Sequence, residues 1–173
     1  MKKIYFGIAA VAIILDQITK ITANTQLNMH EQNPVMPFFN FTLMYNYGAA
    51  FSFLSNAGGW QRWFFTAVAV IISIVLIVWL CRLKAHEKWL GVGLALVLGG
   101  AIGNVIDRIR LGYVIDFIQW FGNWNGNTYY WPAFNIADAA IFTGTALILL
   151  TSFFTGDEPE NKSADKKSTA GNS

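Results

Sequence analysis

Four aspartates lie near the ends of long apolar segments in this 173-residue sequence, a setting that is costly for a charge. They are Asp16, Asp107, Asp116 and Asp138. A charged side chain at the centre of a membrane helix costs roughly 2.5–3.5 kcal/mol on insertion scales. Carboxylates at such a depth are therefore expected to be paired, hydrated or close to the membrane surface.

Asp116 and Asp138 have no obvious cation nearby in the sequence. Asp116 lies in GYVIDFI between apolar neighbours, and Asp138 lies in FNIADAAIF with Asn135 three residues before it. A carboxylate in an apolar setting has a raised pKa, and two that are forced together share one proton. Such a pair can hydrolyse a peptide bond, because the ionised member takes a proton from water while the protonated member polarises the carbonyl oxygen. Taken singly, each is equally well explained as a carboxylate at a helix end.

The other two aspartates have partners within their own segments. In LDQITK, Asp16 and Lys20 are four residues apart, so they share a helix face and form a structural ion pair in the simplest interpretation. In GGAIGNVIDR, Asp107 shares a face with Asn104 and Arg108, which can orient it. We therefore expect Asp107 to belong to the scaffold.

The elements that position these residues are four apolar segments. The chain is 54% hydrophobic and 13% charged, whereas soluble domains carry about 25% charged residues. Segments at about 4–23, 63–81, 89–107 and 134–154 are long enough to cross a bilayer as helices. The first also has the features of a secretory signal peptide, but it continues through Asp16 and Lys20 without a clean cleavage site, so we expect a retained helix.

One glycine pattern indicates how these helices pack. Gly99 and Gly103 form a G-x-x-x-G stripe in the third segment. Small residues at this spacing are typical of close helix–helix contacts in membranes.

Basic residues predict the orientation of the chain. Lys2, Lys3 and the 82–88 connection (RLKAHEK) share one side with the lysines of the tail. The positive-inside rule then places both termini in the cytoplasm and gathers the four aspartates at the outer face. Three arginines are exceptions on the outer side: Arg62, Arg108 and Arg110.

Two longer segments face outward in this topology. The segment at about 24–61 contains FFNFTLMYN, which predicts one or two short strands. The segment at about 108–133 is rich in tryptophan and tyrosine, which suits either an aromatic belt at the headgroup level or a flap over the site. We therefore expect an all-α membrane protein with four transmembrane helices and a small extracytoplasmic β-rich segment, spanning residues 1–155. The polar composition of 156–173 predicts a disordered cytoplasmic tail.

Composition also excludes several classes of function. The net charge of +2 is too small to indicate nucleic-acid binding, and the lone Cys81 cannot form an internal disulfide. His30 and His86 are far apart and no cluster has metal-ligand spacing, so we expect no metal and no organic cofactor.

Five ordered motifs, LDQITK, MYNYGAAFS, GGAIGNVIDR, GYVIDF and FNIAD, resemble those of the lipoprotein signal peptidases, or type II signal peptidases, over nearly the whole chain. Members of this family are four-helix inner-membrane aspartic peptidases of bacteria, which remove the signal peptide of prolipoproteins just before a diacylglyceryl-modified cysteine. The resemblance implies that Asp116 and Asp138 form the catalytic dyad. The positions that it implies as substrate-binding or site-supporting are Asp16, Lys20, Asn46, Gly48, Asn104, Asp107, Arg108 and Asn135.

The same resemblance implies where the protein works and what it contacts. It implies a multi-pass protein of the bacterial inner membrane, with its active site near the periplasmic face. Its partners would be lipid-modified prolipoprotein signal peptides and membrane lipids, and we expect a monomer. The segment around Asn46 and Gly48 would clamp the lipid-modified cysteine or simply pack as a strand. The spacer that contains NWNGNTYY is somewhat longer than is usual in the family.

Two other classes of protein are compatible with intramembrane carboxylates. A small proton- or cation-coupled transporter subunit uses such groups as relays, but it needs polar residues across the membrane depth. The inner halves of the second and fourth segments, AVIISIVLIVWL and GTALILLTSFF, are almost purely apolar and argue against a conduit. A non-catalytic assembly scaffold would leave the setting of Asp116 and Asp138 unexplained.

Overall fold

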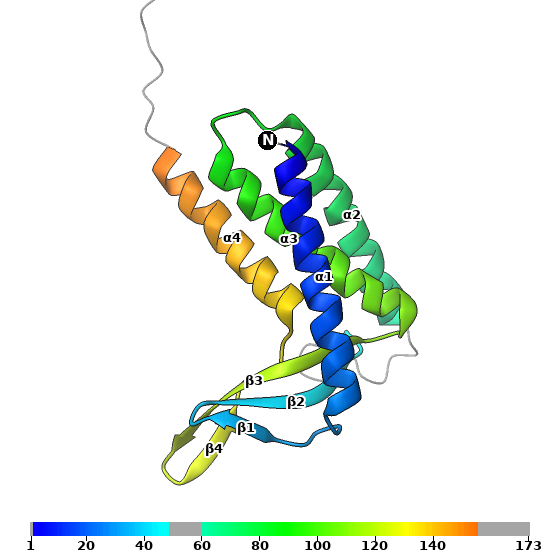
Figure 1. Cartoon of the computed structure of the whole chain (residues 1–173), viewed down its shortest axis with the longest axis vertical. Coiled ribbons are helices and arrows are strands. Elements are labelled where there is room, and N and C mark those ends of the chain that lie inside the picture. Colours follow the sequence, from blue (N-terminus) through cyan, green and yellow to red (C-terminus); the bar gives the residue numbers. More distant parts are fainter. Residues whose placement is uncertain (1, 49–59, 156–173) are drawn as a thin grey trace, which may run out of the picture.

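The computed structural model describes residues 2–48 and 60–155 (Figure 1). Its four helices are α1 (Lys2–Gln26), α2 (Trp60–Arg82), α3 (Lys88–Arg110) and α4 (Ile136–Thr155). By length and composition, all four can cross a membrane. The prediction of four membrane helices is confirmed, and the observed ends differ from the predicted ones by one to three residues.

Helix α3 is the centre of the bundle and packs against the other three helices (Figure 1). Its glycines allow the close approach. A Cβ atom on Gly99 would lie 2.8 Å from the carbonyl oxygen of Ala9 in α1, and one on Gly100 would lie 2.3 Å from that of Ala137 in α4. Both glycines therefore bring backbones into direct contact. The close-contact face predicted from the glycine pattern is confirmed.

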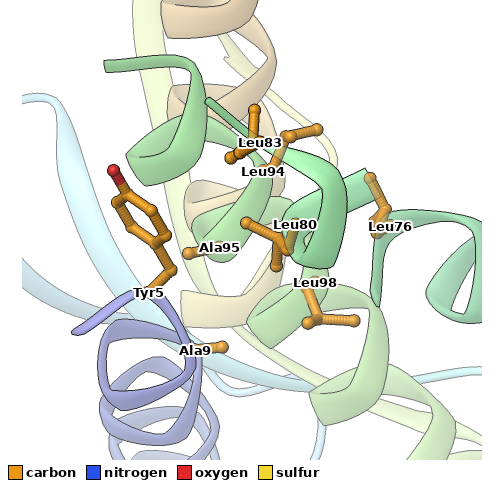
Figure 2. Close-up of a cluster of buried hydrophobic side chains, with 8 residues drawn as sticks. All are labelled: Tyr5, Ala9, Leu76, Leu80, Leu83, Leu94, Ala95 and Leu98. Atoms are coloured by element: carbon orange, nitrogen blue, oxygen red, sulfur yellow. The ribbon is translucent and has the colours of Figure 1, made fainter. Parts of the chain in front are cut away.

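A cluster of buried apolar side chains holds α1, α2 and α3 together at the end of the bundle that carries the N-terminus. Tyr5 of α1 lies over Gly91 of α3, and Leu80 of α2 is completely buried beside Leu94 (Figure 2). Helix α1 is therefore packed as an integral part of the bundle.

A four-stranded sheet lies at the opposite end of the bundle (Figure 1). Its strands are β1 (Asn33–Met36), β2 (Phe39–Asn46), β3 (Val114–Trp124) and β4 (Asn127–Tyr130). They pair antiparallel in the order β1-β2-β3-β4, so β2 and β3 join two segments that are far apart in the sequence. One strand, β2, forms from the FFNFTLMYN stretch, in agreement with the predicted one or two. Strands β3 and β4 were not predicted, and they occupy the aromatic segment at 108–133.

The β3–β4 hairpin turns on two residues with positive φ, Asn125 at 50° and Gly126 at 77°. A two-residue Asn-Gly loop is the preferred connection between antiparallel strands, because its twist matches that of the strands. The longer spacer noted in the sequence therefore forms an extended hairpin.

A second apolar cluster fixes the sheet to the bundle. Ala23, near the end of α1, packs against Leu43 of β2 and against Ile115 and Phe117 of β3. This contact sets β3 across the ends of α1 and α3, next to the start of α4. The predicted tail at 156–173 lies outside the described residues.

Candidate active site

All of the predicted site residues belong to one polar network at the junction of the bundle and the sheet. The network is built from the ends of α1 and α3, the start of α4, and the strands β2 and β3. It joins residues from five separate elements, so its geometry depends on the complete fold.

Lys20 is at the centre of the part of this network that lies within the helices. Its ammonium group lies 2.9 Å from Asp16 Oδ2, 3.0 Å from Asp107 Oδ2 and 2.9 Å from Asn104 Oδ1. An ammonium group has three donors, so these contacts satisfy all of them. The side chains of Lys20 and Asp16 are almost completely buried, and removing one partner of such an ion pair leaves an uncompensated buried charge. The predicted pair of Asp16 and Lys20 is confirmed.

Of the two partners expected for Asp107, Asn104 was wrong, whereas the charge of Arg108 does act on it. Asp107 accepts hydrogen bonds from Gln17 Nε2 at 3.0 Å and from the backbone N–H of Ile115 at 3.2 Å, in addition to its contact with Lys20. Asn104 instead donates a hydrogen bond from its amide to Asp138. Arg108 interacts with Asp107 electrostatically. Spacing within α3 could not predict this, because the stronger partners come from α1 and β3.

Asn135 links Asp116 and Asp138 directly. Its side-chain amide donates to Asp116 Oδ1 at 2.7 Å, and its side-chain carbonyl accepts the backbone N–H of Asp138 at 2.9 Å. Its backbone N–H donates to Asp138 Oδ2 at 3.2 Å. Asn135 is completely buried and caps the first turn of α4. The two aspartates therefore meet around one fixed asparagine.

Asn104 connects this pair to the buried lysine. Its amide donates to Asp138 Oδ1 at 2.8 Å, while its carbonyl oxygen accepts from Lys20 Nζ at 2.9 Å. The lysine therefore fixes which end of the Asn104 amide points at Asp138.

Asn46 and Gly48 approach Asp116 from β2. Asn46 Nδ2 donates to Asp116 Oδ2 at 3.2 Å, and its carbonyl accepts the backbone N–H of Gly48 at 2.9 Å. Gly48 has a φ of 96°, and a Cβ atom there would lie 2.6 Å from the ring of Phe65. Only glycine fits this turn without strain. Gly48 thus orients the amide that faces Asp116.

Asp16 helps to hold the start of α4 in place. Its Oδ1 atom accepts the backbone N–H of Ala137 at 2.9 Å. This N–H is in the first turn of α4, where backbone donors have no partner within the helix. A carboxylate at a helix N-terminus also interacts favourably with the helix dipole. Asp16 therefore ties α1 to the segment that carries Asp138.

The charges of the network are unbalanced. Four aspartates face two cations, Lys20 and Arg108, so full ionisation would leave an excess of negative charge. Burial and, after it, the nearby charge of Asp138 together raise the pKa of Asp116 to about 7. Arg108 is half-buried, and its guanidinium carbon lies 5.7 Å from the centre of the Phe65 ring. Its charge interacts with those of Asp116 and Asp138.

One member of the network was missed in the sequence. Gln17 Nε2 lies 3.2 Å from both Asp16 Oδ2 and the carbonyl oxygen of Gly103, and it also reaches Asp107. A polar residue next to Asp16 within an apolar segment was the available signal.

The fold and the site together define a class of protein. At one end of a bundle of apolar helices, Asp116 and Asp138 meet around Asn135, and the pKa of Asp116 is raised to about 7; perturbed carboxylates of this kind are typical of sites that use acid–base chemistry, as in the aspartic peptidases. Among the residues that the structure describes, there is no group of three or more His, Cys, Asp or Glu side chains arranged to hold a metal ion.

Comparisons with known proteins give the family. The family model described as Signal peptidase (SPase) II matches residues 8–154. A lipoprotein signal peptidase of Alteromonas mediterranea is 51% identical over 170 residues, which cover 98% of this chain and 91% of the relative. One from Acinetobacter baumannii is 52% identical over 162 residues, covering 93% and 90% of the two chains. The chain belongs to the signal peptidase II family, whose members are proteases of the aspartic type.

Solved structures support the same assignment. A bacterial membrane enzyme determined by the in meso method at 2.3 Å resolution is 31% identical, with 94% of each chain covered and a TM-score of 0.77. A second, at 1.9 Å resolution, is 33% identical, with 90% of this chain and 95% of the other covered and a TM-score of 0.75. The alternative of a transporter subunit is not supported by these comparisons.

Proposed function

We propose that this protein removes signal peptides from bacterial prolipoproteins and that Asp116 and Asp138 are its catalytic dyad. The relatives that are named lipoprotein signal peptidases support the substrate class. The observation that carries the choice of residues is the link through Asn135, which contacts both carboxylates within hydrogen-bond distance.

The two aspartates have different roles in the proposed reaction. Asp116 carries the proton, because its pKa is raised to about 7 by burial and by the charge of Asp138. Asp138 accepts hydrogen bonds from Asn104 and Asn135 on its two oxygens, and we assign it the role of the base. Asp138 takes a proton from the attacking water, while Asp116 polarises the carbonyl oxygen of the peptide bond. The proton that Asp138 took from water then passes to the leaving amine as the C–N bond of the peptide breaks.

The remaining residues position these groups or the substrate. Lys20, Asp16 and Asp107 hold the ends of α1, α3 and β3 together. Asn46 and Gly48 lie on the opposite side of Asp116, where a clamp over the lipid-modified cysteine would need to be. In this proposal, the enzyme cuts just before that cysteine.

The proposed orientation follows from charge. The N-terminus and the α2–α3 connection lie at the end of the bundle away from the sheet (Figure 1), and Lys2, Lys3, Lys84 and Lys88 lie at this end. The positive-inside rule places this end of the bundle at the cytoplasmic side of the membrane. The sheet and the aspartates then lie at the periplasmic face of the inner membrane, where water reaches them from outside. Residues 1–155 form a monomeric peptidase domain that is surrounded by membrane lipid, and 156–173 form a cytoplasmic tail.

The proposal is tested with the purified full-length protein and a precursor that carries a diacylglyceryl-modified cysteine. The wild type should release the signal peptide, and the Asp116→Asn and Asp138→Asn proteins should bind the precursor without cutting it. A reporter that is active only in the periplasm should be silent when fused after Ser173. Cleavage by either aspartate variant would refute the dyad, and an active reporter would refute the orientation.

A further inference from the structure

An apolar cavity opens directly beside Asp138. It lies along the first turns of α4 and beneath the β3–β4 hairpin, with a volume of about 810 Å³. Sites for small organic ligands have volumes of roughly 300–1,000 Å³, so this one is large enough for a substantial group. Among its lining residues, the aromatic ones are Trp120, Trp131, Phe134 and Phe142.

The wall of the cavity is fixed by the sheet. Trp131 donates its backbone N–H to Trp120 at 2.8 Å, and its carbonyl accepts the side-chain amide of the buried Gln119 at 3.0 Å. The rings of Trp120 and Phe134 meet edge to face with their centroids 6.4 Å apart. These contacts hold the aromatic wall of the cavity in place.

An extended peptide is a poor occupant for this cavity. A peptide needs donors and acceptors for its backbone, especially at membrane depth. The backbone groups of Trp131 are used within the sheet, and Phe134 both donates to and accepts from Ile118. Pro132, which also lines the cavity, has no N–H to offer. An alkyl chain has no such requirement.

We propose that this cavity holds one acyl chain of the diacylglyceryl group on the substrate cysteine. The inference rests on the proposed function, and it adds a residue-level subsite to it. In a substrate cut just before that cysteine, the acyl chains begin within a few bonds of the scissile peptide. Asp138 lines the cavity, so a chain that enters it places the scissile peptide next to the aspartate pair.

The cavity acts by orienting the substrate. An acyl chain gains little free energy by moving from lipid into an apolar cavity, because the bilayer interior is equally apolar. Correct placement of the reacting bond, in contrast, contributes directly to the rate. The effect should therefore appear in kcat/KM for long-chain substrates.

The structure offers matched pairs of residues for a test. Trp131 lines the cavity and is 71% exposed, while Trp124 lies on the same hairpin outside the lining and is 72% exposed. Phe142 lines the cavity and is 77% exposed, while Phe153 lies further along α4 and is 80% exposed. Alanine substitution at either residue of a pair therefore removes the same kind of ring, with a similar exposed fraction.

The first experiment compares two precursors, one with long acyl chains and one whose glycerol carries acetyl groups. Trp131→Ala and Phe142→Ala should lower kcat/KM for the long-chain precursor about tenfold, because a less well placed reacting bond reacts more slowly even where the binding free energy hardly changes. Both should leave the diacetyl precursor almost unchanged, so that the preference for long chains collapses. Trp124→Ala and Phe153→Ala should keep the preference. Variants that slow both precursors equally would overturn the proposal, as would a changed preference for peptide residues before the cut with the chain preference intact.

A second experiment reads binding without cleavage. The Asp116→Asn protein is mixed with a precursor that carries a photoreactive diazirine in its acyl chains, and the labelled residues are mapped. Labelling should concentrate at Trp131 and Phe142 rather than at Trp124 and Phe153. Uniform labelling of the lipid-facing surface would refute the acyl-chain subsite. If the wild type fails to cleave, the proposed function falls, while this mapping still decides the occupant of the cavity.

Discussion

The side-chain amide of Asn135 donates to Asp116 Oδ1 over 2.7 Å, although the two residues belong to different elements and are 19 positions apart. The carbonyl end of the same amide is held by the backbone N–H of Asp138 at 2.9 Å. The amide cannot turn over without losing both contacts. Asn135 therefore sets the position of one carboxylate relative to the helix that carries the other.

Replacing Asn135 should consequently impair both chemistry and stability. Asn135→Ala removes the donor to Asp116 and the cap of α4, so we expect kcat to fall about 10²-fold or more and the stability to fall by about 1 kcal/mol. Asn135→Asp keeps an N-cap acceptor but places a third carboxylate, completely buried, against Asp116 and Asp138, so it should lose activity and lower the melting temperature as well. Steady-state rates and thermal melts measure both. An alanine variant with normal kcat would show that the link has no role in the reaction.

The aspartates should behave as one unit. Asp116→Asn and Asp138→Asn each remove one member of the acid–base pair, so each should lower kcat about 10³-fold or more, and the double variant should be hardly worse. Binding of the precursor should persist, because asparagine preserves the shape of the side chain. Rates and precursor affinities of the three variants provide the measurement. Additive losses in the double variant would mean that the two carboxylates act independently.

Local patterns in the sequence predicted the features that lie within one element. The four helices follow from long apolar runs, and the ion pair of Asp16 with Lys20 follows from its four-residue spacing. Contacts between elements were beyond such patterns. Asn104 shares a helix face with Asp107, yet its amide points to Asp138, because Lys20 from another helix occupies its carbonyl end.

The sheet shows a second limit of sequence patterns. Strand β3 buries consecutive residues from Val114 to Phe117, so it lacks the polar–apolar alternation that identifies a half-exposed strand. Its partner β2 comes from a segment about 70 residues earlier, and no local signal encodes that pairing. The Asn125-Gly126 turn was the detectable sign of the hairpin.

Lys20 should be essential for stability. Lys20→Met retains most of the volume and removes the charge, which leaves Asp16 and Asp107 buried without their common cation. Breaking a buried ion pair in this way costs about 3–5 kcal/mol. We expect a large fall in melting temperature and in the yield of folded protein. Lys3→Met, an exposed lysine on the same helix, is the control and should melt like the wild type. Equal melting temperatures for the two variants would contradict the structural role of Lys20.

Gly103 should tolerate no side chain. A Cβ atom there would lie 2.6 Å from Asp16 Oδ2, which is held by Lys20 and Gln17, so Gly103→Ala should displace the ion pair and lower the melting temperature. Gly7→Ala in α1 meets nothing within 4 Å and should be neutral or stabilising by up to about 1 kcal/mol, because alanine favours a helix. Thermal melts of the two variants test the contrast. A destabilised Gly7→Ala with an unaffected Gly103→Ala would refute the packing described at the α1–α3 contact.

The raised pKa of Asp116 predicts how activity depends on pH. Burial and the charge of Asp138 raise this pKa from its ordinary value of 3.8 to about 7, so the side chain keeps its proton in acidic solution and is about half protonated near pH 7. The proposed reaction needs that proton. We therefore expect kcat/KM to fall as the pH rises through about 7, because Asp116 then loses the proton with which it polarises the carbonyl oxygen. A rate that rises through this range and stays high in alkaline solution would contradict the role of Asp116 as the acid.

The same pKa shift has a consequence for stability, which separates the titration of Asp116 from the chemistry. Between about pH 4 and 7 the folded protein binds one more proton at Asp116 than the unfolded chain does. The stabilisation from this proton is complete below the unfolded pKa and is lost as the pH rises through the folded one. The melting temperature of the wild type should fall across this window. Asp116→Asn cannot titrate, so its melting temperature should fall less over the same range. Parallel curves for the two proteins would show that a different group carries the shifted pKa.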